Sequence, residues 1–223
     1  MSADKPFKTH LTLMDRFVLR VLNAVFKWQL GYEGPTTEET IRTYGWRAVL
    51  VNSPKGAKLI GALEKRYGAA EAQYLIAVSG LMSGCRWCGT SHMLGANLIL
   101  FHADGTLGPL DDGRIKEYEQ LTDEQFIAEL GRVMDNPRWR DTLRAMERLI
   151  ALHSDTAEGD TEDDPMLNEV NAYWDWTTEC TIQAMDWDPI LIPAPVPLAK
   201  DKALIARYRA AREKAQQPAP TEP

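Results

Sequence analysis

The chain has 223 residues, of which 44% are hydrophobic and 26% charged, a balance typical of a folded globular protein rather than a disordered one. Its formal net charge of -7 and pI near 5.2 argue against a non-specific nucleic-acid binder, which needs a basic face. No run of about 18 apolar residues is free of charge, and the apolar segment 11–30 is followed by no signal-peptide cleavage site. We therefore expect no membrane span and a cytoplasmic protein.

Helical periodicity predicts an all-α fold. The length of the chain favours one domain, over residues 1–215. Residues 216–223 have almost no apolar side chain to anchor them and are expected to form a disordered tail. From Met14 to Phe26, apolar residues recur every three or four positions, which is the spacing of one helix face. No segment alternates as a β-strand does. Further helices are expected over residues 69–82, 85–101, 165–185 and 200–215. Helix starts are indicated by four capping patterns: Thr36 with Glu39, Ser53 before Pro54, Thr122 with Gln125, and Asn136 before Pro137.

Two later segments have an unusual composition. Residues 154–165 include six acidic residues and no basic one, which predicts a solvated loop. Further on, the aromatic residues Tyr173, Trp174, Trp176 and Trp187 are interleaved with aspartates. Such a cluster either packs in the core or lines a pocket for an apolar or cationic ligand.

The segment SGCRWCGTSH contains two of the three cysteines and one of the four histidines. In it, Cys85, Cys88 and His92 stand at relative positions 0, 3 and 7, which share one face of a helix. Ser83 and Gly84 indicate a break just before them. Cys85 is therefore expected in the first turn of a helix, where free amides and the helix dipole favour a thiolate.

These three side chains can form a minimal thiol redox centre. His92 can take a proton from a thiol, directly or through a water, and the second cysteine can capture a sulfenic acid or mixed disulfide formed on the first. The chain has three cysteines, and a close pair among so few is typical of redox or metal chemistry rather than of a secreted disulfide framework.

Two other interpretations compete with redox chemistry. Cys85, Cys88 and His92 could be satisfied core residues, since free cysteine is among the most buried residue types. Together with His102 they could also form a metal site, but the loop of about a dozen residues found in zinc fingers is missing. Covalent haem needs a histidine directly after the second cysteine, where the chain has Gly89. We expect neither a metal nor a cofactor.

The segment from Ala69 to Phe101 resembles the alkyl hydroperoxidase D-like group of the carboxymuconolactone decarboxylase superfamily. The signature of that group is a helix ending in small residues, followed by C-x-x-C-x-x-x-H at the start of the next helix. In the group, peroxide oxidises the second cysteine, the first resolves it as a disulfide, and the histidine belongs to a proton relay. The resemblance therefore implies that Cys88 attacks, Cys85 resolves and His92 relays the proton.

The family relay usually contains a glutamate twelve residues before the first cysteine, where this chain has Gln73. Glutamine cannot accept the proton, although it can orient a water or His92 by hydrogen bonding. The nearest carboxylate, that of Glu71, lies two residues away and hence about 200° around the helix. Trp87 stands where the best-known members have a histidine just before the second cysteine.

The resemblance implies a helical homo-oligomer that acts as a thiol-dependent peroxidase or disulfide oxidoreductase, with a peroxide or small disulfide as substrate and a thiol as electron donor. The strongly apolar first helix is compatible with assembly. Two other functions compete. One is a non-redox decarboxylase or isomerase that uses His92 as a general acid–base, although that chemistry needs no thiols. The other is a catalytically silent helical scaffold, favoured by the missing glutamate at position 73.

Overall fold

The computed structural model describes residues 8–34, 36–181 and 193–217, except for the side chains of residues 180 and 181. Every regular element in these ranges is helical, which confirms the all-α prediction. None of the described helices is both long and apolar enough to cross a bilayer. The α-helices are α1 (Leu13–Leu30), α2 (Thr37–Tyr44), α3 (Trp46–Tyr67), α4 (Ala69–Met82), α5 (Arg86–Asp104), α6 (Ile115–Tyr118), α7 (Asp123–Val133), α8 (Arg140–His153), α9 (Asp164–Thr181) and α10 (Lys202–Gln216).

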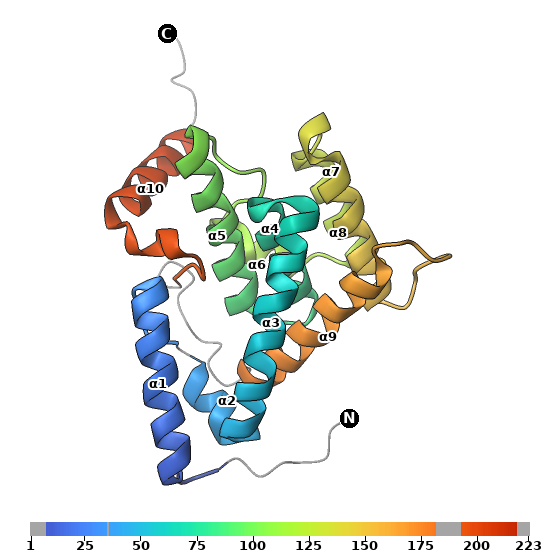
Figure 1. Ribbon diagram of the computed structural model, residues 1–223. Coiled ribbons are helices and arrows are strands. Elements are labelled where there is room, and N and C mark those ends of the chain that lie inside the picture. Colours follow the sequence, from blue (N-terminus) through green and yellow to red (C-terminus); the bar gives the residue numbers. More distant parts are fainter. Residues whose placement is uncertain (1–7, 35, 182–192, 218–223) are drawn as a thin grey trace.

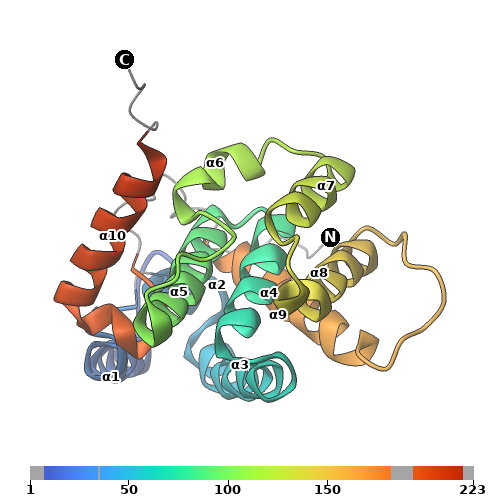
Figure 2. The same cartoon turned by 90° about the horizontal axis from the view of Figure 1, so that it is seen from above.

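Helix α4 lies at the centre of the described fold (Figure 1). Of residues 70–81, all except Glu71 are buried. Figure 2 shows α3, α5, α8 and α9 around α4, and each of these four helices packs against it. A helix that is apolar on every side must be covered on every side. The composition of α4 therefore explains its central position.

Local sequence signals set several helix ends where we predicted them. Helix α4 covers the predicted range 69–82. At the start of α7, Thr122 and Gln125 form a complete capping box. Before α8, the side chain of Asn136 accepts a hydrogen bond from the N–H of Arg138, and Pro137 opens a short 3₁₀ turn that leads into the helix. These patterns satisfy the amides that a helix start leaves unpaired.

The predicted helix start at Ser53 and Pro54 is wrong, because both residues lie inside α3. The Ser53 hydroxyl donates to the carbonyl of Val49 at 2.8 Å instead of capping a new helix. Proline removes the hydrogen bond to the carbonyl of Leu50, four residues earlier. Both Pro54 and Leu50 are exposed, so water can reach the freed carbonyl and the helix continues.

Other helix ends differ by small amounts. Helix α2 begins after Thr36, but the Thr36 side chain makes no cap hydrogen bond, so the predicted box with Glu39 does not form. Helix α9 begins at Asp164 and is described as far as residue 181. Its predicted continuation over residues 182–185 lies outside the described residues, and so does Trp187. Gln216, assigned to the disordered tail, is the last residue of α10 and donates to Asp111 at 2.7 Å. The rest of that predicted tail lies outside the described residues from 218 onwards.

The last two aspartates of the acidic segment after α8 make hydrogen bonds and ion pairs with neighbouring helices. Asp163 accepts hydrogen bonds from Arg66 at 2.9 Å and from Tyr67 at 2.8 Å. Asp164 pairs with Arg148 at 2.6 Å. The prediction of a solvated segment is therefore wrong for these two aspartates, because the neighbouring helices α3 and α8 supply arginine partners.

Candidate active site

Gly84 ends α4 and turns the chain into α5. Its φ of +79° lies in the left-handed region, which glycine adopts without a steric penalty. The N–H of Cys85 donates to the carbonyl of Gly80 at 2.8 Å, and the N–H of Gly84 donates to the carbonyl of Leu81 at 2.9 Å. These two bonds form a Schellman motif. The break predicted before the cysteines is thus the C-terminal cap of α4.

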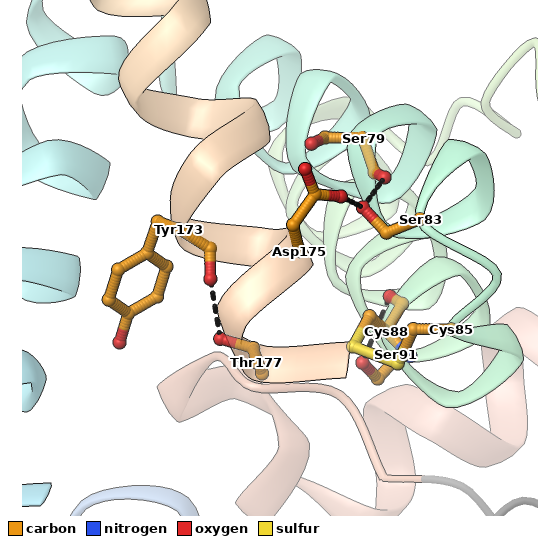
Figure 3. Close-up of a disulfide and its surroundings, with 8 residues drawn as sticks. All are labelled: Ser79, Ser83, Cys85, Cys88, Ser91, Tyr173, Asp175 and Thr177. Atoms are coloured by element: carbon orange, nitrogen blue, oxygen red, sulfur yellow. Dashed lines mark hydrogen bonds between the residues drawn. A yellow bond between two sulfur atoms is a disulfide. The ribbon is translucent and has the colours of Figure 1, made fainter. Parts of the chain in front are cut away.

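Cys85 is the N-cap residue of α5, one position before the first turn in which we expected it. Its Sγ accepts a hydrogen bond from the N–H of Cys88 at 3.1 Å. The two residues form a disulfide with Sγ atoms 2.18 Å apart, shown in Figure 3. Backbone N–H groups and the positive end of a helix dipole both favour negative charge on a sulfur at this position.

Two glycines bring α4 and α5 into close contact at the cysteines. A Cβ added at Gly80 would lie 2.7 Å from the Cβ of Cys88, and one added at Gly89 would lie 2.8 Å from the side chain of Leu81. Neither glycine was expected in the site from its position in the sequence. The close approach of the helices leaves Cys85 and Cys88 with 0% exposure.

His92 lies one turn after Cys88 on α5 and is hydrogen-bonded to Gln73 of α4. Its Nδ1 stands 2.7 Å from Oε1 of Gln73. With the amide oxygen facing the ring, Nδ1 carries the hydrogen and donates it, so Nε2 is left unprotonated. Burial lowers the pKa of His92 to about 3. The ring is therefore neutral at physiological pH, and Nε2 can accept a proton, but the lowered pKa makes it a weak base.

The described hydrogen-bond contacts of His92 include no carboxylate. Glu71 lies on another side of α4, as expected, because a Cβ at Gly68 would stand 2.5 Å from its Oε2. Arg86, next to Cys85, pairs with Glu119 at 2.7 Å, so its positive charge is compensated. A thiolate at this position would therefore be stabilised by the start of α5, because the neutral ring of His92 adds no positive charge.

Trp174 of α9 is a member of the site that sequence reasoning missed. Its ring contacts His92 edge to face, with centroids 5.6 Å apart and planes at 78°. Trp174 is 3% exposed. It covers the imidazole and restricts the orientation of that ring. The aromatic cluster was visible in the sequence, but nothing in its spacing connected one tryptophan to a histidine about 80 residues earlier.

A polar contact joins α9 to the turn before Cys85. Ser83 Oγ stands 2.6 Å from Oδ1 of Asp175 and 2.9 Å from the carbonyl oxygen of Ser79 (Figure 3). His153 Nε2 stands 3.4 Å from the same aspartate oxygen. Asp175 is therefore directed toward the turn that positions the cysteines, a role the sequence did not indicate.

The geometry does not bring His102 to the cysteines. His102 is exposed in the last turn of α5, ten residues after His92. At 1.5 Å per residue this separation is about 15 Å along the helix. Within the part of the chain that the structure describes, no three His, Cys, Asp or Glu side chains are grouped as metal ligands.

The site therefore combines a disulfide-forming cysteine pair at a helix N-terminus with a neutral histidine and an amide, all of them buried. Such a set can exchange electrons through sulfur and move one proton. Comparisons of the chain with protein-family models, with curated proteins and with solved structures find no match in any of the three.

Proposed function

We propose that the protein is a thiol-dependent peroxidase or disulfide oxidoreductase that cycles between a Cys85–Cys88 dithiol and a disulfide. The observation that carries the proposal is the placement of the pair. The two sulfurs stand at bonding distance at the start of α5, and His92 follows Cys88 by one helical turn. The resemblance of residues 69–101 to the alkyl hydroperoxidase D-like group adds support.

In the proposed cycle, Cys88 attacks the terminal oxygen of a peroxide. The O–O bond breaks, a sulfenic acid forms on Cys88, and the other oxygen leaves as water or an alcohol. Nε2 of His92 takes the thiol proton and returns it to the leaving oxygen. Cys85 then attacks the Cys88 sulfur, so that an S–S bond forms and water leaves. An external dithiol restores the reduced pair by exchange.

Gln73 has a limited role in this cycle. Its Oε1 accepts a hydrogen bond from the Nδ1–H of His92, which favours the tautomer with Nε2 unprotonated. It cannot neutralise the imidazolium that forms when His92 accepts a proton. Because burial already disfavours that charged form, the cycle is expected to be slow compared with one that has a carboxylate at this position. We place the protein in the cytoplasm, where thiol donors are abundant.

We further propose that the chain forms a homo-oligomer through the outer face of α1. Large apolar side chains along this face are exposed, among them Leu13 at 85%, Phe17 at 63% and Trp28 at 75%. Val21 and Val25 continue the same face at spacings of four residues. A row of this length exceeds the scattered apolar residues found on monomers. A second copy of the chain, presenting its own α1, is the proposed partner.

The two single cysteine variants test the redox proposal. Reduced Cys88→Ser is expected to form no disulfide with hydrogen peroxide, whereas Cys85→Ser is expected to trap a sulfenic acid or a mixed disulfide on Cys88. The matched control is Cys180→Ser, which leaves the pair intact and should behave as wild type. If Cys88→Ser traps the adduct instead, the attacking and resolving roles are exchanged. If wild type does not react at all, the silent scaffold becomes the better account.

A further inference from the structure

A second site lies between α3 and α9. It is a pocket of about 780 Å³, a volume within the range of small-molecule sites. In Figure 3, Tyr173 projects from α9 on the side away from the disulfide, so the pocket is separate from the cysteines. We call it the α3–α9 pocket. The lining residues that matter here are Lys55, Lys58, Leu59, Met166, Tyr173 and Trp176.

Aromatic rings form the α9 side of the pocket. The centroids of Tyr173 and Trp176 are 5.8 Å apart, with planes at 49°. The end of the Tyr173 ring rests on α3 at Gly56, where an added Cβ would stand 2.3 Å from the phenol oxygen. Trp176 is held in turn by Tyr44, at a centroid distance of 5.7 Å. Rings fixed in this way offer a rigid apolar surface to a ligand at small entropic cost.

Two lysines stand on the α3 side. Lys55 and Lys58 are three residues apart and so share one face of the helix. Neither takes part in an ion pair among the described residues. Among the described residues, the lining includes one acidic residue, Glu169. The pocket is thus locally cationic in a chain whose net charge is -7.

The charge of the lining changes the interpretation of the aromatic cluster. The interleaved aspartates suggested a cationic ligand, but Asp175 is directed toward Ser83 and His153 and is not part of the pocket. The other two aspartates, Asp186 and Asp188, lie outside the described residues, and the described lining contains Lys55 and Lys58. A cation would be attracted by the rings and by Glu169 but repelled by both ammonium groups, whereas an anion would be attracted by two ammonium groups and repelled by one carboxylate.

We infer that the α3–α9 pocket binds a small organic anion with a flat apolar body, of the aromatic carboxylate class. The apolar body lies against Tyr173 and Trp176, and the carboxylate faces Lys55 and Lys58. This inference does not rest on the proposed redox cycle, because Cys85, Cys88 and His92 are not among the residues that line the pocket.

Isothermal titration calorimetry with 2-naphthoate tests the site in the full-length protein. The neutral 2-naphthamide and the cationic 2-naphthylmethylammonium serve as ligands of matched shape. We expect 2-naphthoate to bind with a Kd of about 1 mM or lower, the amide to bind at least several-fold more weakly, and the cation not to bind. Equal affinity for all three, or no binding of 2-naphthoate, would overturn the inference.

Three variants locate the binding on the molecule. The double change Lys55→Glu and Lys58→Glu alters exposed side chains and should weaken 2-naphthoate binding about tenfold or more. Ala62→Trp, at an exposed position of the lining, should block the pocket. The matched control is Lys65→Glu, exposed on the same helix but outside the pocket, which should leave the Kd unchanged. Unchanged binding in the double variant or in Ala62→Trp, or an equal loss in Lys65→Glu, would also overturn the inference.

Discussion

Nδ1 of His92 and Oε1 of Gln73 are 2.7 Å apart, so a neutral amide occupies the place beside the imidazole where a carboxylate could stabilise its protonated form. The amide fixes the tautomer of the ring but adds no charge. Both side chains are buried, at 7% and 3% exposure. Any positive charge on His92 is therefore poorly stabilised.

Gln73→Glu is expected to accelerate the reaction with hydrogen peroxide near neutral pH. The new carboxylate would stabilise the imidazolium and raise the pKa of His92, which makes it a stronger base toward the thiol. The gain should fall at the low end of the roughly 10²–10⁴ range that positioned acid–base groups supply. The second-order rate is measured for wild type and variant from pH 5 to 9.

The matched control for this change is Glu71→Gln, which alters a carboxylate of the same helix that points elsewhere. It should leave the rate unchanged. A folded Gln73→Glu protein that reacts no faster than wild type would show that residue 73 is outside the relay.

The depressed pKa of His92 predicts how stability depends on pH. The unfolded chain binds a proton near pH 6.5, whereas the folded protein binds it near pH 3. This contribution to the free energy of unfolding is therefore complete above about pH 6.5 and is lost progressively as the pH falls toward 3. Relative to His92→Asn, wild type should lose up to about 1.4 kcal/mol per pH unit in urea titrations between pH 6 and 4. Parallel curves for the two proteins would show that His92 is not buried as described.

Gly80→Ala should destabilise the protein, because its Cβ would stand 2.7 Å from the Cβ of Cys88 and force α4 and α5 apart. Overpacking of this kind costs about 1–3 kcal/mol. Gly61→Ala is the matched control, since an added Cβ there meets nothing within 4 Å. It should stabilise the helix by about 0.4–1 kcal/mol. Urea denaturation of both variants measures the difference, and equal effects would contradict the described helix contact.

Phe17→Asp is expected to weaken self-association. Phe17 is 63% exposed on the outer face of α1, so the change leaves the described core of one subunit intact. Light scattering after size-exclusion chromatography should show an oligomer for wild type and a smaller species for the variant. Glu64→Ala, exposed on α3, serves as the control and should assemble as wild type. A monomeric wild type would contradict the proposed assembly.

The sequence predicts those parts of the structure that local interactions determine. The sequence of residues 69–82 gives the bounds of α4, the pair Thr122 and Gln125 gives the start of α7, and Gly84 gives the turn before the cysteines. The spacing of Cys88 and His92 places both on one side of α5. Each of these signals acts within a few residues and needs no knowledge of the tertiary fold.

Contacts between distant segments were not predictable in this way. Nothing local links Trp174 to His92, or Asp175 to Ser83, because α9 reaches the site through tertiary packing, mainly on α4 and α8. Glycines are equally ambiguous. In sequence Gly80 looks like Gly61, although the first faces a neighbouring helix and the second faces open space.

The most direct test of the redox account is a count of free thiols in the reduced protein before and after one equivalent of hydrogen peroxide. The chain has three cysteines, so the account predicts a fall from three free thiols to one. Peptide mass analysis should find the new disulfide within one chain, between Cys85 and Cys88. Three free thiols after the addition of peroxide, or a disulfide that involves Cys180 instead, would contradict the redox account.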